Sequence, residues 1–150
     1  MSEQKHVLYA IELTDQVDEL VKKVITEVKK SGAKITVYNA LKGVVGALDA
    51  GAVYIPGQAL LDIEKEMVEQ AHQQIKTLAN ETGLSEDDIV VEVHVEPRQA
   101  ILEKAKELKV DKIILNGHHH SLFGRLGSTA DAIINKADCT VTIVRENKYK

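Results

Sequence analysis

The chain has 150 residues, of which 44% are apolar and only 3% aromatic, so its size fits one globular domain over residues 1–150 with an aliphatic core. Nineteen basic and 23 acidic residues give a formal net charge of −4, which argues against a nucleic-acid-binding surface. The single Cys139 excludes an internal disulfide and favours a cytoplasmic setting, and no apolar run approaches the roughly 18 residues that span a membrane.

Strands and helices alternate from the start of the chain. The apolar run His6–Ile11 predicts a first strand. Apolar residues at helical spacing from Asp15 to Lys30 predict a helix, with Thr14 or Asp15 as its cap. A second strand is expected over residues 33–41.

The middle of the chain combines a long loop with a long helix. Lys42–Gly57 contains several glycines and is long for a compact domain, which is typical of functional or mobile loops. The segment 58–82 has the pattern of an amphipathic helix. Its inward face is expected to consist of Leu60, Leu61, Met67, Val68, Ala71, Ile75, Leu78 and Ala79.

The last 60 or so residues repeat the alternation. Residues 89–95 predict a third strand, and Pro97 suits the first position of the helix that follows. The unbroken apolar run within 112–116 is typical of a strand covered on both faces. A helix over 128–136, with Ala130, Ile133 and Ile134 inward, then leads to a final strand over Thr140–Arg145.

This order predicts an α/β fold, a Rossmann-like or flavodoxin-like three-layer sandwich around a mostly parallel five-stranded sheet. In such sheets, ligands bind beyond the carboxyl ends of the strands, where the winding direction reverses. If the first and fourth strands are neighbours at that point, Glu12 and Gly117 face the same crevice. The helix start at Ser128-Thr129 offers free backbone N–H groups, the arrangement that binds phosphate in α/β proteins.

Three segments carry a resemblance to a known family. They are VLYAIELT around the end of the first strand, DKIILNGHHH around the end of the fourth, and the final GSTADAIINKADCTVTIVR. Together they resemble the universal stress protein family over nearly the whole chain. The resemblance implies the strand order 3-2-1-4-5, a role in the stress response, and homodimers formed through the last strand, here Thr140–Arg145.

The nucleotide motif of that family is altered in this sequence. ATP-binding members carry a glycine, two residues, a glycine, nine residues and then Gly-Ser/Thr. Here Gly117 matches the first glycine, His120 stands at the second, and only six residues separate His120 from Gly127. These departures resemble the universal stress protein A type, in which ATP binding is generally not seen. They predict a non-catalytic dimer with a degenerate cleft and no bound cofactor; the alternative is an ATP- or AMP-binding signalling module, with weak ATP hydrolysis as a corollary.

The candidate cleft residues each have a structural alternative. Glu12 could contact a ribose or hold its turn, Gly117 could serve the cleft or only the turn, and Arg125 could pair with phosphate or with a carboxylate. A bound anion and a helix cap would use the same N–H groups near Ser128. The full candidate set is Glu12, Gly117, His118, His120, Arg125, Gly127, Ser128 and Thr129.

Metal binding and catalysis find little support in the sequence. The three consecutive histidines from His118 to His120 diverge along the chain and cannot easily close one tetrahedral site, which favours a polar or pH-sensitive loop. Cys139 has no evident cationic neighbour, so a buried inert thiol is favoured over a redox sensor. No arrangement of nucleophile, acid and base is apparent in the sequence.

Overall fold

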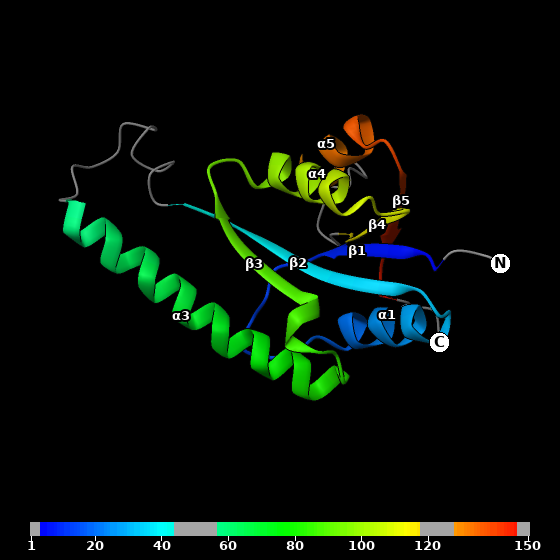
Figure 1. Ribbon diagram of the computed structural model, residues 1–150, viewed down its shortest axis with the longest axis horizontal. Coiled ribbons are helices and arrows are strands. Elements are labelled where there is room, and N and C mark those ends of the chain that lie inside the picture. Colours follow the sequence, from blue (N-terminus) through cyan, green and yellow to red (C-terminus); the bar gives the residue numbers. More distant parts are fainter. Residues whose placement is uncertain (1–3, 44–56, 118–127, 147–150) are drawn as a thin grey trace.

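The computed structural model describes residues 4–43, 57–117 and 128–146. A five-stranded parallel sheet with the order β3-β2-β1-β4-β5 forms its centre (Figure 1). Its strands are β1 His6–Ala10, β2 Lys34–Lys42, β3 Ile89–His94, β4 Lys112–Asn116 and β5 Thr140–Val144. The predicted strand order and the predicted α/β fold class are both confirmed.

Helices cover both faces of the sheet, which gives three layers (Figure 1). They are α1 Glu19–Lys30, α3 Gly57–Thr82, α4 Pro97–Leu108 and α5 Ser128–Lys136, with a short 3-10 helix, η1, at Glu86–Asp88. Side chains of α1 and α3 share one core with Tyr9, Val37 and Ile114 of the sheet. Side chains of α4 and α5 share the other core with Leu8, Tyr38 and Leu115.

Helix α1 begins later than its apolar pattern predicted. Asp18 is its N-cap, and the Asp18 Oδ1 atom accepts a hydrogen bond of 2.9 Å from the Leu20 N–H. The prediction that Thr14 or Asp15 caps this helix was therefore wrong. The chain from residue 11 to residue 18 is non-helical. In this segment the Leu13 N–H donates to Asn39, and the Thr14 hydroxyl donates to the Gln16 carbonyl.

The inward faces of α3 and α5 were predicted too broadly. Leu61 and Val68, both expected to point inward, are 64% and 41% exposed, and the buried residues of α3 all lie in its second half. Figure 1 shows the reason, since the first half of α3 extends beyond the strands. On α5, Ile133 is fully buried, whereas Ile134 is 43% exposed.

Two further predictions concern the long loop and membrane-spanning segments. Most of the predicted loop Lys42–Gly57, residues 44–56, lies outside the described residues. Among the helices that are described, none is both long enough and apolar enough to cross a membrane.

Candidate functional site

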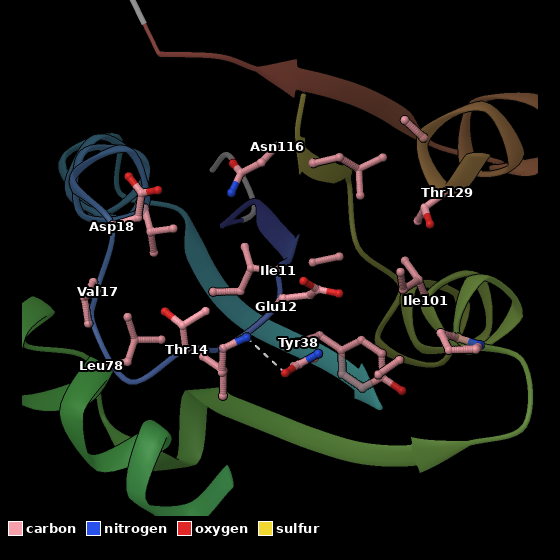
Figure 2. A pocket seen from close by; sticks show the side chains of 18 of the residues that line it. Ile11, Glu12, Thr14, Val17, Asp18, Tyr38, Leu78, Ile101, Asn116 and Thr129 are labelled. Carbon is pink, nitrogen blue, oxygen red and sulfur yellow. Dashed lines mark hydrogen bonds between the residues drawn. The ribbon is translucent and has the colours of Figure 1, made fainter. Parts of the chain in front are cut away.

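A crevice opens at the carboxyl ends of β1 and β4, where the winding of the sheet reverses. The chain leaves β1 toward α1 on one face, whereas it leaves β4 toward α5 on the other face. Side chains from both faces surround a cavity of about 340 Å³ at this point (Figure 2). This volume lies within the usual range for small-molecule pockets. The cavity thus occupies the place where topology predicted a ligand site.

The walls of the cavity are largely apolar. Val17, Val21 and Leu78 line it from the side of α1 and α3, and Ile101 and Leu115 line it from the side of α4. Val21, Leu78, Ile101 and Leu115 are also buried members of the two cores. The shape of the cavity therefore depends on the same packing that holds the helices on the sheet.

Of the candidate residues, Glu12 and Thr129 line this cavity, whereas Gly117 is not among its described lining residues. Glu12 follows β1 and sits in the middle of the view in Figure 2, and Thr129 approaches from the start of α5. Among the described residues that line the cavity, the charged ones are Glu12 and Asp18, and both are carboxylates. This part of the wall is therefore electrostatically unfavourable for a phosphate group.

Two asparagines of the cavity were missed by the sequence reasoning. Asn39 is buried in β2, and its Oδ1 atom accepts a hydrogen bond of 3.0 Å from the Leu13 N–H (dashed line in Figure 2). This bond holds the turn after β1, the role that the sequence had suggested for Glu12. Asn116, the last residue of β4, accepts a hydrogen bond of 2.6 Å at Oδ1 from the Tyr9 hydroxyl. Burial raises the pKa of Tyr9 well above its ordinary value, so this hydroxyl stays protonated.

Gly117 is explained by close packing at the end of β5. Its N–H donates to the Val144 carbonyl at 2.8 Å, and its φ is not in the left-handed region. A Cβ at this position would lie 2.8 Å from Arg145 Nε and 3.1 Å from Ile143 Cγ2. The hindrance to a side chain at this position therefore comes from neighbouring side chains and not from the backbone conformation. This contact supports the structural reading of Gly117, and its role in a nucleotide cleft stays a prediction.

The remaining candidates divide into two groups. His118, His120, Arg125 and Gly127 lie outside the described residues, and for Ser128 only its place as the first residue of α5 is described. In the part of the chain that is described, no group of three metal-ligating side chains comes together. Cys139 is partly buried, and burial, assisted by the nearby Asp138 carboxylate, raises the pKa of its thiol. A raised pKa favours the inert thiol over the redox sensor.

Comparison with known proteins gives concordant sequence and fold matches. A model of the universal stress protein family matches residues 3–145. The chain is 35% identical over 86 residues to universal stress protein A homolog 2 of Coxiella burnetii, a match that covers 57% of this chain and 58% of that protein. It is 24% identical over 144 residues to universal stress protein A of Yersinia pestis, covering 93% and 90% of the two chains. The solved structure of universal stress protein UspA from Lactobacillus plantarum superposes with a TM-score of 0.70 at 16% identity, covering 97% of this chain and 100% of that one.

Proposed function

The chain belongs to the universal stress protein family, and from that premise we propose that it is a non-catalytic, dimeric stress-response protein of the cytoplasm whose crevice does not bind ATP tightly. The observation that carries this proposal is the charge of the crevice. Its described walls contain two carboxylates, Glu12 and Asp18, and no lysine or arginine. A nucleoside triphosphate bound there would meet like charges in a partly enclosed space.

The length of the loop after β4 supports the same conclusion. Six residues separate His120 from Gly127, where the ATP-binding pattern of the family has nine. A shorter connection has less slack to surround a triphosphate and return to the start of α5. Position 120 also carries a histidine where the ATP-binding pattern has a glycine.

The absence of catalysis is proposed from the chemistry of the lining residues. The polar side chains of the described lining are carboxylates, amides, threonine hydroxyls and one tyrosine hydroxyl. None of these described residues is a histidine, cysteine or lysine that could serve as a nucleophile or base near neutral pH. We accordingly propose that the crevice catalyses no reaction on a molecule that binds in it.

The second candidate function is an adenine-nucleotide-binding signalling module that uses the same crevice. One observation supports this second function. Thr129 at the start of α5 lines the cavity, so the N-terminus of that helix lies beside the cavity. Backbone N–H groups at a helix start attract anions. ATP or AMP bound there would act as a signal, and slow hydrolysis of ATP would be a side reaction.

Calorimetric titration with ATP, ADP and AMP tests the two candidates. The native protein is expected to show no saturable binding of ATP below about 1 mM. In His120→Gly, the dissociation constant for ATP is expected to change by less than about threefold, because the loop stays short and the carboxylates remain. Micromolar ATP affinity in the native protein would establish the second candidate. The same affinity in His120→Gly alone would show that a side chain, rather than loop length or charge, closes the cleft.

The proposed homodimer forms through the last strand, Thr140–Arg145. Within the described sheet, β5 is an edge strand that pairs only with β4, and Val141 to Val144 are partly exposed. An edge of this kind presents unpaired backbone groups that a second copy can satisfy. In an antiparallel twofold pair centred on this strand, Thr142 would face its own counterpart.

Thr142→Lys is therefore expected to convert the dimer into a monomer. Two like charges would face each other across the twofold axis, which destabilises a strand pair. Sedimentation velocity measures the assembly directly, and Thr142→Val, which adds no charge, is the matched control. If the lysine variant stays dimeric with an unchanged sedimentation coefficient, the dimer uses a different surface.

A further inference from the structure

We propose that the chain has a second surface for its own copies, in which the first half of α3 of one copy docks into a groove at the C-terminal ends of α4 and α5 of the next copy. This contact is separate from the β5 edge and joins copies head to tail. The occupant of the groove is a second copy of this chain, because the two surfaces are both apolar at their centres and opposite in charge around them.

The first surface is an exposed stripe on α3, formed by Leu61, Asp62, Val68 and Glu69. Leu61 and Val68 are 64% and 41% exposed and stand seven residues apart, so they lie on one face of the helix. Asp62 and Glu69 are exposed and follow them with the same spacing, which places a carboxylate beside each apolar side chain. A single exposed apolar residue is ordinary, but this pair lies on the half of α3 that extends beyond the strands (Figure 1). Residues 57–70 carry four carboxylates and one lysine, so this half of the helix is acidic.

The second surface is a groove of about 590 Å³ at the C-terminal ends of α4 and α5. The apolar part of its lining includes Leu102, Ala105, Val110, Ile113 and Ala137. Its other lining residues include Lys106, Lys109 and Lys136, which are exposed and form no ion pair within the described chain. The carboxylates in the lining are Glu103 and Asp138. Lysines therefore outnumber carboxylates at the groove, although the whole chain has a net charge of −4.

The helix ends account for only part of this arrangement. Lysines near the last turn of a helix are favourable because the helix dipole is negative there, and both helices end at the groove. The dipole does not explain why apolar side chains lie open between these lysines. A helix face with apolar and acidic side chains complements both features, because it covers the apolar lining and brings carboxylates to the lysines. Two stripes would not pair with each other in this way, because their carboxylates would repel.

The two surfaces lie on opposite faces and at opposite ends of the sheet. Helix α3 lies on the face that α1 covers, whereas α4 and α5 lie on the other face (Figure 1). The first half of α3 is near the carboxyl end of β2, since a Cβ on Gly43, directly after β2, would lie 3.5 Å from Glu64 Oε1. The groove is near the amino end of β5, since Cys139, directly before β5, lines it. The contact is therefore heterologous, and each pair of copies keeps one stripe and one groove free for further copies.

Sedimentation velocity of the whole native chain tests whether this assembly forms. The sedimentation coefficient is expected to rise above that of the dimer as the protein concentration increases from about 10 µM to about 1 mM. Sodium chloride at about 0.5 M is expected to reduce the rise, because salt screens the charges. Leu61→Gln is expected to weaken the association by about tenfold, because the exposed leucine becomes buried in the contact. The urea midpoint of this variant should equal that of the native protein.

An exchange of charge between two variants identifies the two surfaces. The double substitution Asp62→Lys and Glu69→Lys reverses the stripe, and Lys106→Glu with Lys136→Glu reverses the groove. Each variant alone is expected to associate at least about tenfold more weakly than the native protein, because its stripe and groove then carry like charges. An equimolar mixture of the two is expected to assemble again, because the stripe of each variant is opposite in charge to the groove of the other.

A matched control separates the stripe from net charge. Glu86→Lys with Asp87→Lys makes the same change in net charge at exposed positions of η1, and this variant should associate as the native protein does. A sedimentation coefficient of the native protein that is constant up to about 1 mM would overturn the inference. If Leu61→Gln then also lowered the urea midpoint, the chain itself would cover the stripe. Reversed variants that associate like the native protein, or a mixture that does not assemble, would overturn the assignment to these two surfaces. The dimer through β5 is tested separately by Thr142→Lys.

Discussion

Replacing Ile133 with alanine is expected to lower the free energy of unfolding by about 3–4 kcal/mol, the usual size for a buried isoleucine. Ile133 of α5 is fully buried in the core between that helix, α4 and the sheet. Its loss would remove apolar contact and leave a cavity, and the nearby helix residues of this core include small alanines that cannot extend to fill it. Urea denaturation followed by circular dichroism measures the change.

The adjacent Ile134 provides a matched control. Ile134→Ala is the same chemical change in the same helix, so the gain in helix propensity is shared by both variants. Because Ile134 is 43% exposed, its replacement is expected to lower the free energy of unfolding by less than about 1 kcal/mol. Equal losses for the two variants would mean that α5 is rotated about its axis relative to the arrangement described above.

This pair of residues also illustrates what the sequence could predict. Apolar spacing placed both isoleucines on the inward face, and it located the bounds of α5 and β4 correctly. In a nine-residue helix, however, the pattern does not define the centre of the buried stripe. Contact with α4 and β5 decides which of two neighbouring residues is covered. The same reasoning applies to α3, whose apolar face continues past the end of the sheet that buries it.

The crevice was predictable to the extent that topology defines it. The alternation of strands and helices, with a familiar strand order, brought Glu12 and Thr129 to one place. The amides were not predictable, because their roles depend on partners distant in the chain. Tyr9 and Asn116 are 107 residues apart, and Leu13 and Asn39 are 26 apart. The residues next to an asparagine in the sequence do not indicate which distant donor will form a hydrogen bond with it.

Replacing Lys104 with methionine is expected to lower the free energy of unfolding by about 1–2 kcal/mol at pH 7. Lys104 Nζ lies 3.1 Å from Glu92 Oε2 and 3.1 Å from Glu107 Oε2, and 5.7 Å from the centre of the Tyr38 ring. Its side chain is only 12% exposed, so it is better shielded than a typical surface lysine. Methionine keeps an apolar chain of similar length and removes the charge. Lys106→Met, at an exposed position of the same helix, should change stability by less than about 0.5 kcal/mol.

The difference in the free energy of unfolding between the native protein and Lys104→Met should depend on pH, and that dependence identifies the interaction behind it. Burial raises the pKa of Glu92, but the hydrogen bonds from Tyr38 and Lys104 lower it more, so the pKa lies below its ordinary value of 4.5. A carboxyl with a depressed pKa in the folded state contributes stability above its unfolded pKa, and this contribution is lost as the pH falls through the folded pKa. The gap between the native protein and Lys104→Met should therefore be constant near neutral pH and shrink below pH 4.5. Urea titrations at about pH 7 and about pH 3 measure it. A gap of equal size at both values would show that the lysine charge acts through the face of the Tyr38 ring, because a contribution from its ion pair with Glu92 requires the carboxylate to be charged.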